Sequence, residues 1–137
     1  MSVAREGLTR YLRVVSQLAL GVFLVSAGVS HLTVSRLEFQ AQVPTWLPLD
    51  PDFVVVSSGV VEILLGFALI TLWRFRTRVG IVTAHFFVVI FPGNINQFVN
   101  GIDAFGLNSD AARATRLLFQ PLLVLWALWA TEAVRRR

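Results

Sequence analysis

Residues 60–67 read VVEILLGF and place an acid, Glu62, inside an otherwise apolar run from Phe53 to Trp73. A run of this length can cross the hydrocarbon core of a bilayer, which needs about 20 mostly apolar residues as a helix. An unpaired carboxylate at that depth is energetically expensive. The sequence therefore predicts a membrane helix whose acid faces other helices and not lipid.

The composition also indicates a membrane protein. Of the 137 residues, 55% are hydrophobic and 15% are charged, whereas soluble domains average about 45–50% apolar and about 25% charged residues. The chain has neither cysteine nor lysine, which excludes disulfides, thiol catalysis, iron–sulfur ligation and Schiff-base chemistry. Its arginines lie at the ends of apolar runs and form no basic stripe mixed with aromatic residues, so the net charge of +4 does not indicate a nucleic-acid partner.

Four apolar runs are long enough to span a bilayer. We expect helices at about 12–32, 53–73, 79–99 and 115–131, the last reaching this length only when Thr115 and Arg116 are included. In lipid only helices and closed barrels satisfy their own backbone, and these runs lack the alternation of barrel strands. The sequence therefore predicts an all-α, membrane-embedded four-helix bundle that forms a single domain over residues 1–137.

The distribution of arginine predicts the orientation, because cytoplasmic loops are enriched in basic residues. Nine arginines lie before the first run, between the second and third, or at the C-terminus, and the other two connections contain three: Arg36, Arg113 and Arg116. We therefore expect both termini to be cytoplasmic, loops 33–52 and 100–114 to face outward, and the membrane to be the bacterial cytoplasmic (inner) membrane. In the first outer loop the stretch VPTWLPLDP (43–51) contains prolines that prevent a continuous helix, and Trp46 suits the membrane interface.

Each expected helix has one face of polar or small residues, since positions three or four apart lie on the same side. Along the chain these faces hold Gln17, Gly21, Gly28 and His31; then Ser58, Gly59, Glu62 and Gly66; then His85, Pro92 and Asn96; and last Arg116 and Gln120. Small residues let helices approach closely, and polar side chains avoid lipid. We expect these faces to point inward and to form a polar pocket in the outer half of the bundle.

The candidate ligand-binding residues of this pocket are His31, Glu62, His85, Asn94, Asn96, Arg116 and Gln120. A rise of about 1.5 Å per residue puts Glu62 and His85 near one level, so His85, Arg116 or Gln120 is the expected partner of the acid. No residue pattern identifies a catalytic group.

Structural roles would also account for these residues. Glu62 would serve equally as a structural ion pair or a protonated acid that joins helices, and His85 as a hydrogen-bonded core histidine. Arg116 could extend to the lipid headgroups. Asn94 and Asn96 could cap carbonyls that Pro92 leaves free in its helix.

Metal and haem cofactors are not expected. The two histidines, His31 and His85, differ by about 15 Å or more in expected depth, so they could not readily ligate one haem. Two histidines without any cysteine also make a poor transition-metal site. A quinone remains a candidate ligand.

Five motifs occur in an order that resembles the DoxX-like family of small four-helix membrane proteins: GVFLVSAGVSHL (21–32), VPTWLP (43–48), GVVEILLG (59–66), FPGNINQF (91–98) and RLLFQPLLVLWAL (116–128). The resemblance covers nearly the whole chain. It implies functional positions at His31, Glu62, Pro92 with Asn94, and Arg116 with Gln120. That family takes its name from a subunit associated with a thiosulfate:quinone oxidoreductase, and relatives are linked to membrane redox complexes or to assembly of other membrane proteins.

Three functions therefore stay open. The first is a redox-associated accessory subunit that binds a quinone-like or other lipophilic ligand, in which His31, His85, Arg116 and Gln120 donate hydrogen bonds and Glu62 relays a proton. The second is a non-enzymatic assembly or scaffold protein, and the third is a small transporter, which would need to oligomerise. The expected partners are the lipid bilayer, a membrane oxidoreductase and further copies of the chain.

Overall fold

The computed structural model describes residues 2–40, 43–102 and 109–133, and this part of the chain is helical with no strand. The elements in order are α1 (Val3–Leu32), α2 (Arg36–Gln40), α3 (Pro51–Thr71), the 3₁₀ turn η1 (Trp73–Phe75), α4 (Arg76–Val99) and α5 (Asp110–Ala130). The all-α fold class predicted from the sequence is confirmed.

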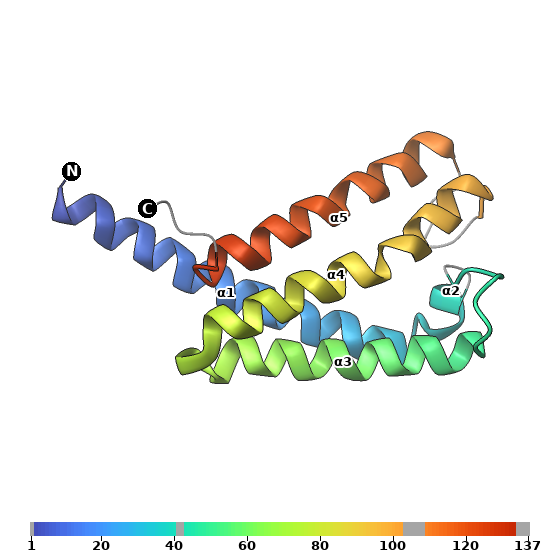
Figure 1. The fold of residues 1–137 in the computed structure, drawn as a ribbon, viewed down its shortest axis with the longest axis horizontal. Coiled ribbons are helices and arrows are strands. Elements are labelled where there is room, and N and C mark those ends of the chain that lie inside the picture. The colour runs from blue at the N-terminus through green and yellow to red at the C-terminus, as the bar shows by residue number, and fades with distance from the viewer. Residues whose placement is uncertain (1, 41–42, 103–108, 134–137) are drawn as a thin grey trace.

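The four long helices form two antiparallel pairs (Figure 1). Helix α1 packs most extensively against α3, and α4 against α5, while the two pairs meet through α1–α5 and α3–α4 contacts. Successive long helices run in opposite directions, so the first and last helices have their N-terminal and C-terminal ends, respectively, at the same end of the molecule (Figure 1). Helix α2 lies at the opposite end, beside the start of α3.

The helix boundaries differ from those predicted by hydropathy. Helix α1 begins at Val3, well before the expected Leu12, because the polar residues of its first turns favour a helix although they cannot lie in lipid. Helix α3 ends at Thr71 and is followed by η1. Helix α5 begins at Asp110, where Ser109 accepts a hydrogen bond from the Ala112 amide, as a helix cap does.

Glycines bring α1 and α3 into backbone contact. A Cβ atom added at Gly66 would lie 2.6 Å from the carbonyl oxygen of Gly21, and one added at Gly28 would lie 2.6 Å from that of Gly59. Such distances leave no room for a side chain, so each glycine is required by the closeness of the opposite backbone. The expectation that the small residues of both helices face inward is confirmed.

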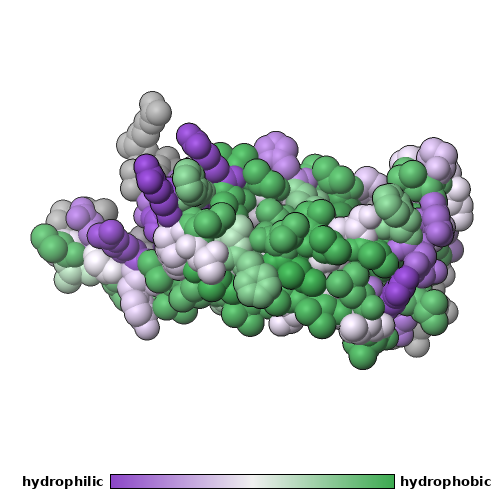
Figure 2. Space-filling model, turned by 90° about the horizontal axis from the view of Figure 1, so that it is seen from below, coloured by the Kyte–Doolittle hydropathy of each residue, from purple (hydrophilic) through white to green (hydrophobic). Residues whose placement is uncertain are grey.

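A wide apolar band covers the outside of the helices. Figure 2 shows this band on one face, between polar groups at both ends of the molecule. Within the described residues, three segments are long and apolar enough to cross a membrane: Val3–Leu32, Pro51–Thr71 and Trp73–Val99. The chain is therefore suited to contact with a lipid bilayer, as its composition predicted.

Candidate functional site

A cavity of about 650 Å³ lies between the two helix pairs, in the half of the molecule that holds α2. Ligand sites are typically about 300–1,000 Å³, with apolar walls and a few polar groups. Most of the wall is apolar, and four of its aromatic side chains belong to Phe23, Phe39, Trp46 and Phe87. Its polar side chains are Ser30, His31, Ser58, Glu62, Asn94, Arg116 and Gln120.

Gln120 joins the polar groups of α4 and α5. Its Nε2 donates to the carbonyl oxygen of Phe87 at 2.6 Å. Its Oε1 accepts from Asn94 Nδ2 at 3.3 Å and from Arg116 Nη1 at 3.4 Å. With 1% of its surface exposed, Gln120 holds the two helices together by hydrogen bonds in the cavity wall.

Pro92 lies inside α4. Proline has no N–H group, so the carbonyl oxygen four residues earlier, that of Val88, has no donor within the helix. The carbonyl oxygen of the adjacent residue, Phe87, accepts the hydrogen bond from Gln120.

Glu62 is the buried acid that the sequence singled out. It is 4% exposed and lines the cavity. Its Oε2 lies 3.0 Å from Nδ1 of His31, but that nitrogen also lies 2.7 Å from the carbonyl oxygen of Ala27. A carbonyl can only accept, so Nδ1 carries the hydrogen and donates it along its own helix. Among the described residues, Oε2 of Glu62 has no hydrogen-bond partner.

Arg116 provides the positive charge that acts on Glu62. Its half-buried guanidinium lines the same cavity, and the two charges attract each other across it. Glu62, Arg116 and Gln120 all lie in the wall of this one cavity. The three residues belong to α3 and α5, which are far apart in the sequence.

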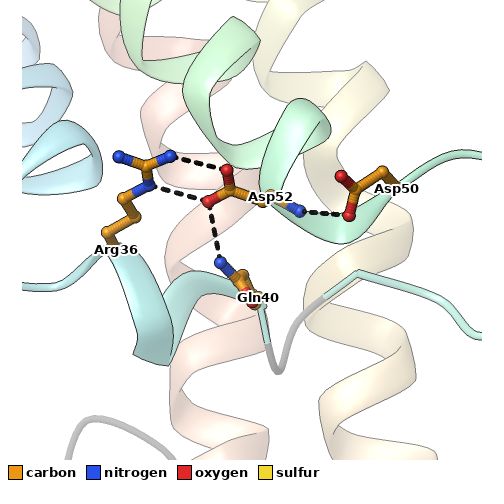
Figure 3. A network of polar contacts seen from close by, with 4 residues as sticks. All are labelled: Arg36, Gln40, Asp50 and Asp52. Carbon is orange, nitrogen blue, oxygen red and sulfur yellow. Dashed lines mark hydrogen bonds and ion pairs between the residues drawn. The ribbon is translucent and has the colours of Figure 1, made fainter.

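Helix α2 covers the outer side of His31. The ring of Phe39 stacks on the imidazole, with the ring centroids 3.4 Å apart and the planes 12° from parallel. Asp52, at the start of α3, holds α2 in this position: it accepts hydrogen bonds from Nε of Arg36 at 2.7 Å and from Nε2 of Gln40 at 2.9 Å (Figure 3). The hydrogen bonds and the negative charge of Asp52 raise the pKa of Arg36.

Two of the expected pocket residues lie elsewhere. His85 is exposed on α4, does not line the cavity and approaches the carbonyl oxygen of Ile81. Its predicted place beside Glu62 is wrong, because His85 and Asn94 are nine residues apart and so lie on opposite sides of a helix. The helix turns Asn94 inward. Asn96 is buried but is not a wall residue, and its Oδ1 accepts from Asn100 at 2.7 Å.

The outer cover of the cavity, formed by α2 and the loop that follows it, was not predicted from the sequence. Residues of α2 and of the following loop line it: Phe39, Val43, Pro44, Trp46 and Leu47. The signal was present, since apolar and aromatic residues in a loop need some surface to cover. The VPTWLP motif thus provides one wall of the cavity.

The described residues contain no group of three or more His, Cys, Asp or Glu side chains suited to hold a metal ion.

Residues 20–131 match the model of a family described as a domain of unknown function (DUF8561). The chain belongs to the DUF8561 family. This match includes every residue named above as part of the cavity wall. No curated protein and no solved structure matches the chain.

Proposed function

We propose that the protein is an integral membrane protein of the bacterial cytoplasmic membrane, embedded as a four-helix bundle. Three helices meet the length and hydropathy expected of spans. Helix α5 packs along α4 and exposes Leu118, Phe119, Leu122 and Leu125, which suits it to lipid as the fourth span. The arginine asymmetry favours cytoplasmic termini. The start of α1 and the end of α5 lie at the same end of the molecule (Figure 1), as this orientation requires.

A cysteine-labelling experiment tests this orientation in a chain that has no cysteine of its own. Cysteine at position 46 should react with an impermeant reagent added to intact cells, since Trp46 is exposed in the outer loop. Cysteine at position 7 should react only after the cells are opened, because Gly7 has free space around it at the N-terminal end. Labelling of position 7 in intact cells would contradict the orientation.

We further propose that the cavity binds a quinone-like or other lipophilic molecule, and that the protein serves as a redox-associated accessory subunit. The observation that carries the proposal is the cavity itself, with apolar and aromatic walls around a cluster that contains Glu62 and Arg116. Wall residues Phe23 and Val89 are 44% and 72% exposed in the apolar band, which favours entry of the ligand from the bilayer. The ordered motifs that resemble the DoxX-like family support the link to membrane redox complexes.

A scaffold role is the second candidate, and Gln120 favours it. Both ends of this side chain are occupied by contacts that join α4 to α5. A core built only to fix helix pairing would use its polar groups in this way.

Extraction of the purified protein separates the two candidates. The wild-type protein in mild detergent should retain a quinone or similar lipophile, detected by chromatography and ultraviolet–visible spectra of the extract. Ser58→Phe should lose it, because Ser58 lines the cavity and the larger ring would fill the space. Ser57→Phe, at a neighbouring position that does not line the cavity, is the matched control and should retain it. An extract of the wild type without any such molecule, together with an unchanged set of protein partners in Ser58→Phe, would favour the scaffold.

A further inference from the structure

The carboxylate of Glu62 has an unused hydrogen-bond acceptor in the cavity wall. Its Oε2 is buried and without a hydrogen-bond partner among the described residues. The closest ring N–H, at His31, donates to Ala27 instead. A buried polar atom without a partner is costly, so native structures rarely keep one unless a ligand or water completes it.

Glu62 and Arg116 place a carboxylate and a guanidinium in the wall of the same cavity. An ionised carboxylate only accepts hydrogen bonds, so a molecule that completes Oε2 must bring a donor. Arg116 gives Gln120 one of its five N–H donors, and its other donors can bind an acceptor on the same molecule.

We infer that the cavity selects a lipophile whose aromatic head group carries a hydroxyl, such as a phenol or hydroquinone, over the corresponding quinone or ether. One hydroxyl can donate to Oε2 of Glu62 and accept from Arg116, whereas a carbonyl or ether oxygen can only accept. This inference rests on the proposed function, and it adds the chemistry of the head group.

The aromatic side chains of the cavity support a ring as the head group. Phe23, Phe39, Trp46 and Phe87 all contribute to the wall. Aromatic rings pack well against one another in offset or edge-to-face arrangements. A flat hydroxylated ring therefore fits this space better than a branched aliphatic alcohol.

The test compares 4-nonylphenol with 4-nonylanisole, its methyl ether, on the purified full-length protein in detergent. The two probes share ring and tail, but only the phenol donates a hydrogen bond. Saturable binding is measured by equilibrium dialysis against protein-free micelles. We expect the phenol to bind about tenfold more tightly or better, because hydrogen bonds to charged groups are strong. For the same reason, decylhydroquinone should bind more tightly than decylquinone.

Variants then assign the preference to Glu62. Glu62→Gln should reduce the phenol-to-ether ratio to less than about threefold, since the amide is uncharged and can also donate to the ether. Glu132→Gln makes the same change at the opposite end of the molecule, where the acid pairs with Arg76 at 2.6 Å, and should keep the wild-type ratio.

The outcomes separate this inference from the proposed function. Equal binding of phenol and ether by the wild type would overturn the inference and leave lipophile binding intact. A ratio that persists in Glu62→Gln, or that falls equally in Glu132→Gln, would overturn it as well. Binding of none of the four probes would overturn both. If Glu62→Gln does not fold, the phenol-to-ether ratio of the wild type alone decides the outcome.

Discussion

The two interfaces of α3 obey different packing rules. Toward α1, glycines at positions 21, 28, 59 and 66 allow the backbones to touch, and no side chain fits between them. Toward α4 and α5, the N-terminal half of α3 faces a cavity of about 650 Å³ whose wall contains Glu62, Arg116 and Gln120. One helix thus carries a closely packed glycine interface on one face and part of the wall of a cavity on another. This difference indicates that the close packing of α1 against α3 fixes the positions of the cavity walls. The polar side chains in those walls provide the hydrogen-bonding groups.

The largest effect is expected at the glycine interface. Gly66→Val would place a side chain where a Cβ already lies 2.6 Å from the carbonyl oxygen of Gly21. We expect a loss of about 3 kcal/mol in the free energy of unfolding, at the high end of overpacking, because two backbones would have to separate. Thermal unfolding in detergent, followed by circular dichroism, measures this loss. Gly7→Val is the matched control, since no atom lies within 4 Å of an added Cβ there, and its equal destabilisation would contradict the role of the glycine interface.

The next effect is expected from the polar groups that join α4 and α5. Gln120→Leu removes the donor to Phe87 and the acceptor for Asn94 and Arg116. Leaving such buried groups without their partner costs about 1–3 kcal/mol, measured in the same unfolding experiment. His85→Leu, an exposed polar-to-apolar change on α4, should stay close to the wild type. Equal stability of the two variants would show that Gln120 does not couple the helices.

A smaller effect should come from coupling across the cavity. Glu62→Gln and Arg116→Gln each remove one of two charges that attract each other. Their combined effect on unfolding should differ from the sum of the single effects by about 0.5–3 kcal/mol, as expected for interacting residues. A double-mutant cycle measures this difference. Strict additivity would mean that the two side chains act independently.

The smallest effect on global stability is expected at the outer cover. Asp52→Asn removes the charge that Arg36 and Gln40 bind (Figure 3), and exposed ion pairs contribute little to overall stability. We expect almost no shift in the midpoint of thermal unfolding but faster hydrogen exchange in residues 36–40. Asp50→Asn is the control, because asparagine can still accept the Asp52 amide hydrogen that Asp50 accepts at 3.2 Å. Equal exchange in both variants would indicate that Asp52 does not hold α2 in place.

The sequence alone determined the helical class, the apolar runs and which faces of α1 and α3 carry small residues. These features depend on the spacing and hydropathy of residues along each helix. It also predicted a pocket that includes Glu62, Asn94, Arg116 and Gln120, and these four residues lie in the cavity wall. Those positions could be found because polar side chains in apolar runs are expensive unless other helices receive them.

Only the tertiary structure decided which polar residues share the site. His85 and Asn94 lie on opposite sides of α4, and the packing of that helix against α5 turned Asn94 toward Gln120 and left His85 outside. Likewise, the contact of Phe39 with His31 depends on how Asp52 holds α2. Spacing along a chain fixes which residues share a face of one helix, but the rotation of that helix is set by its neighbours, through contacts between residues far apart in the sequence.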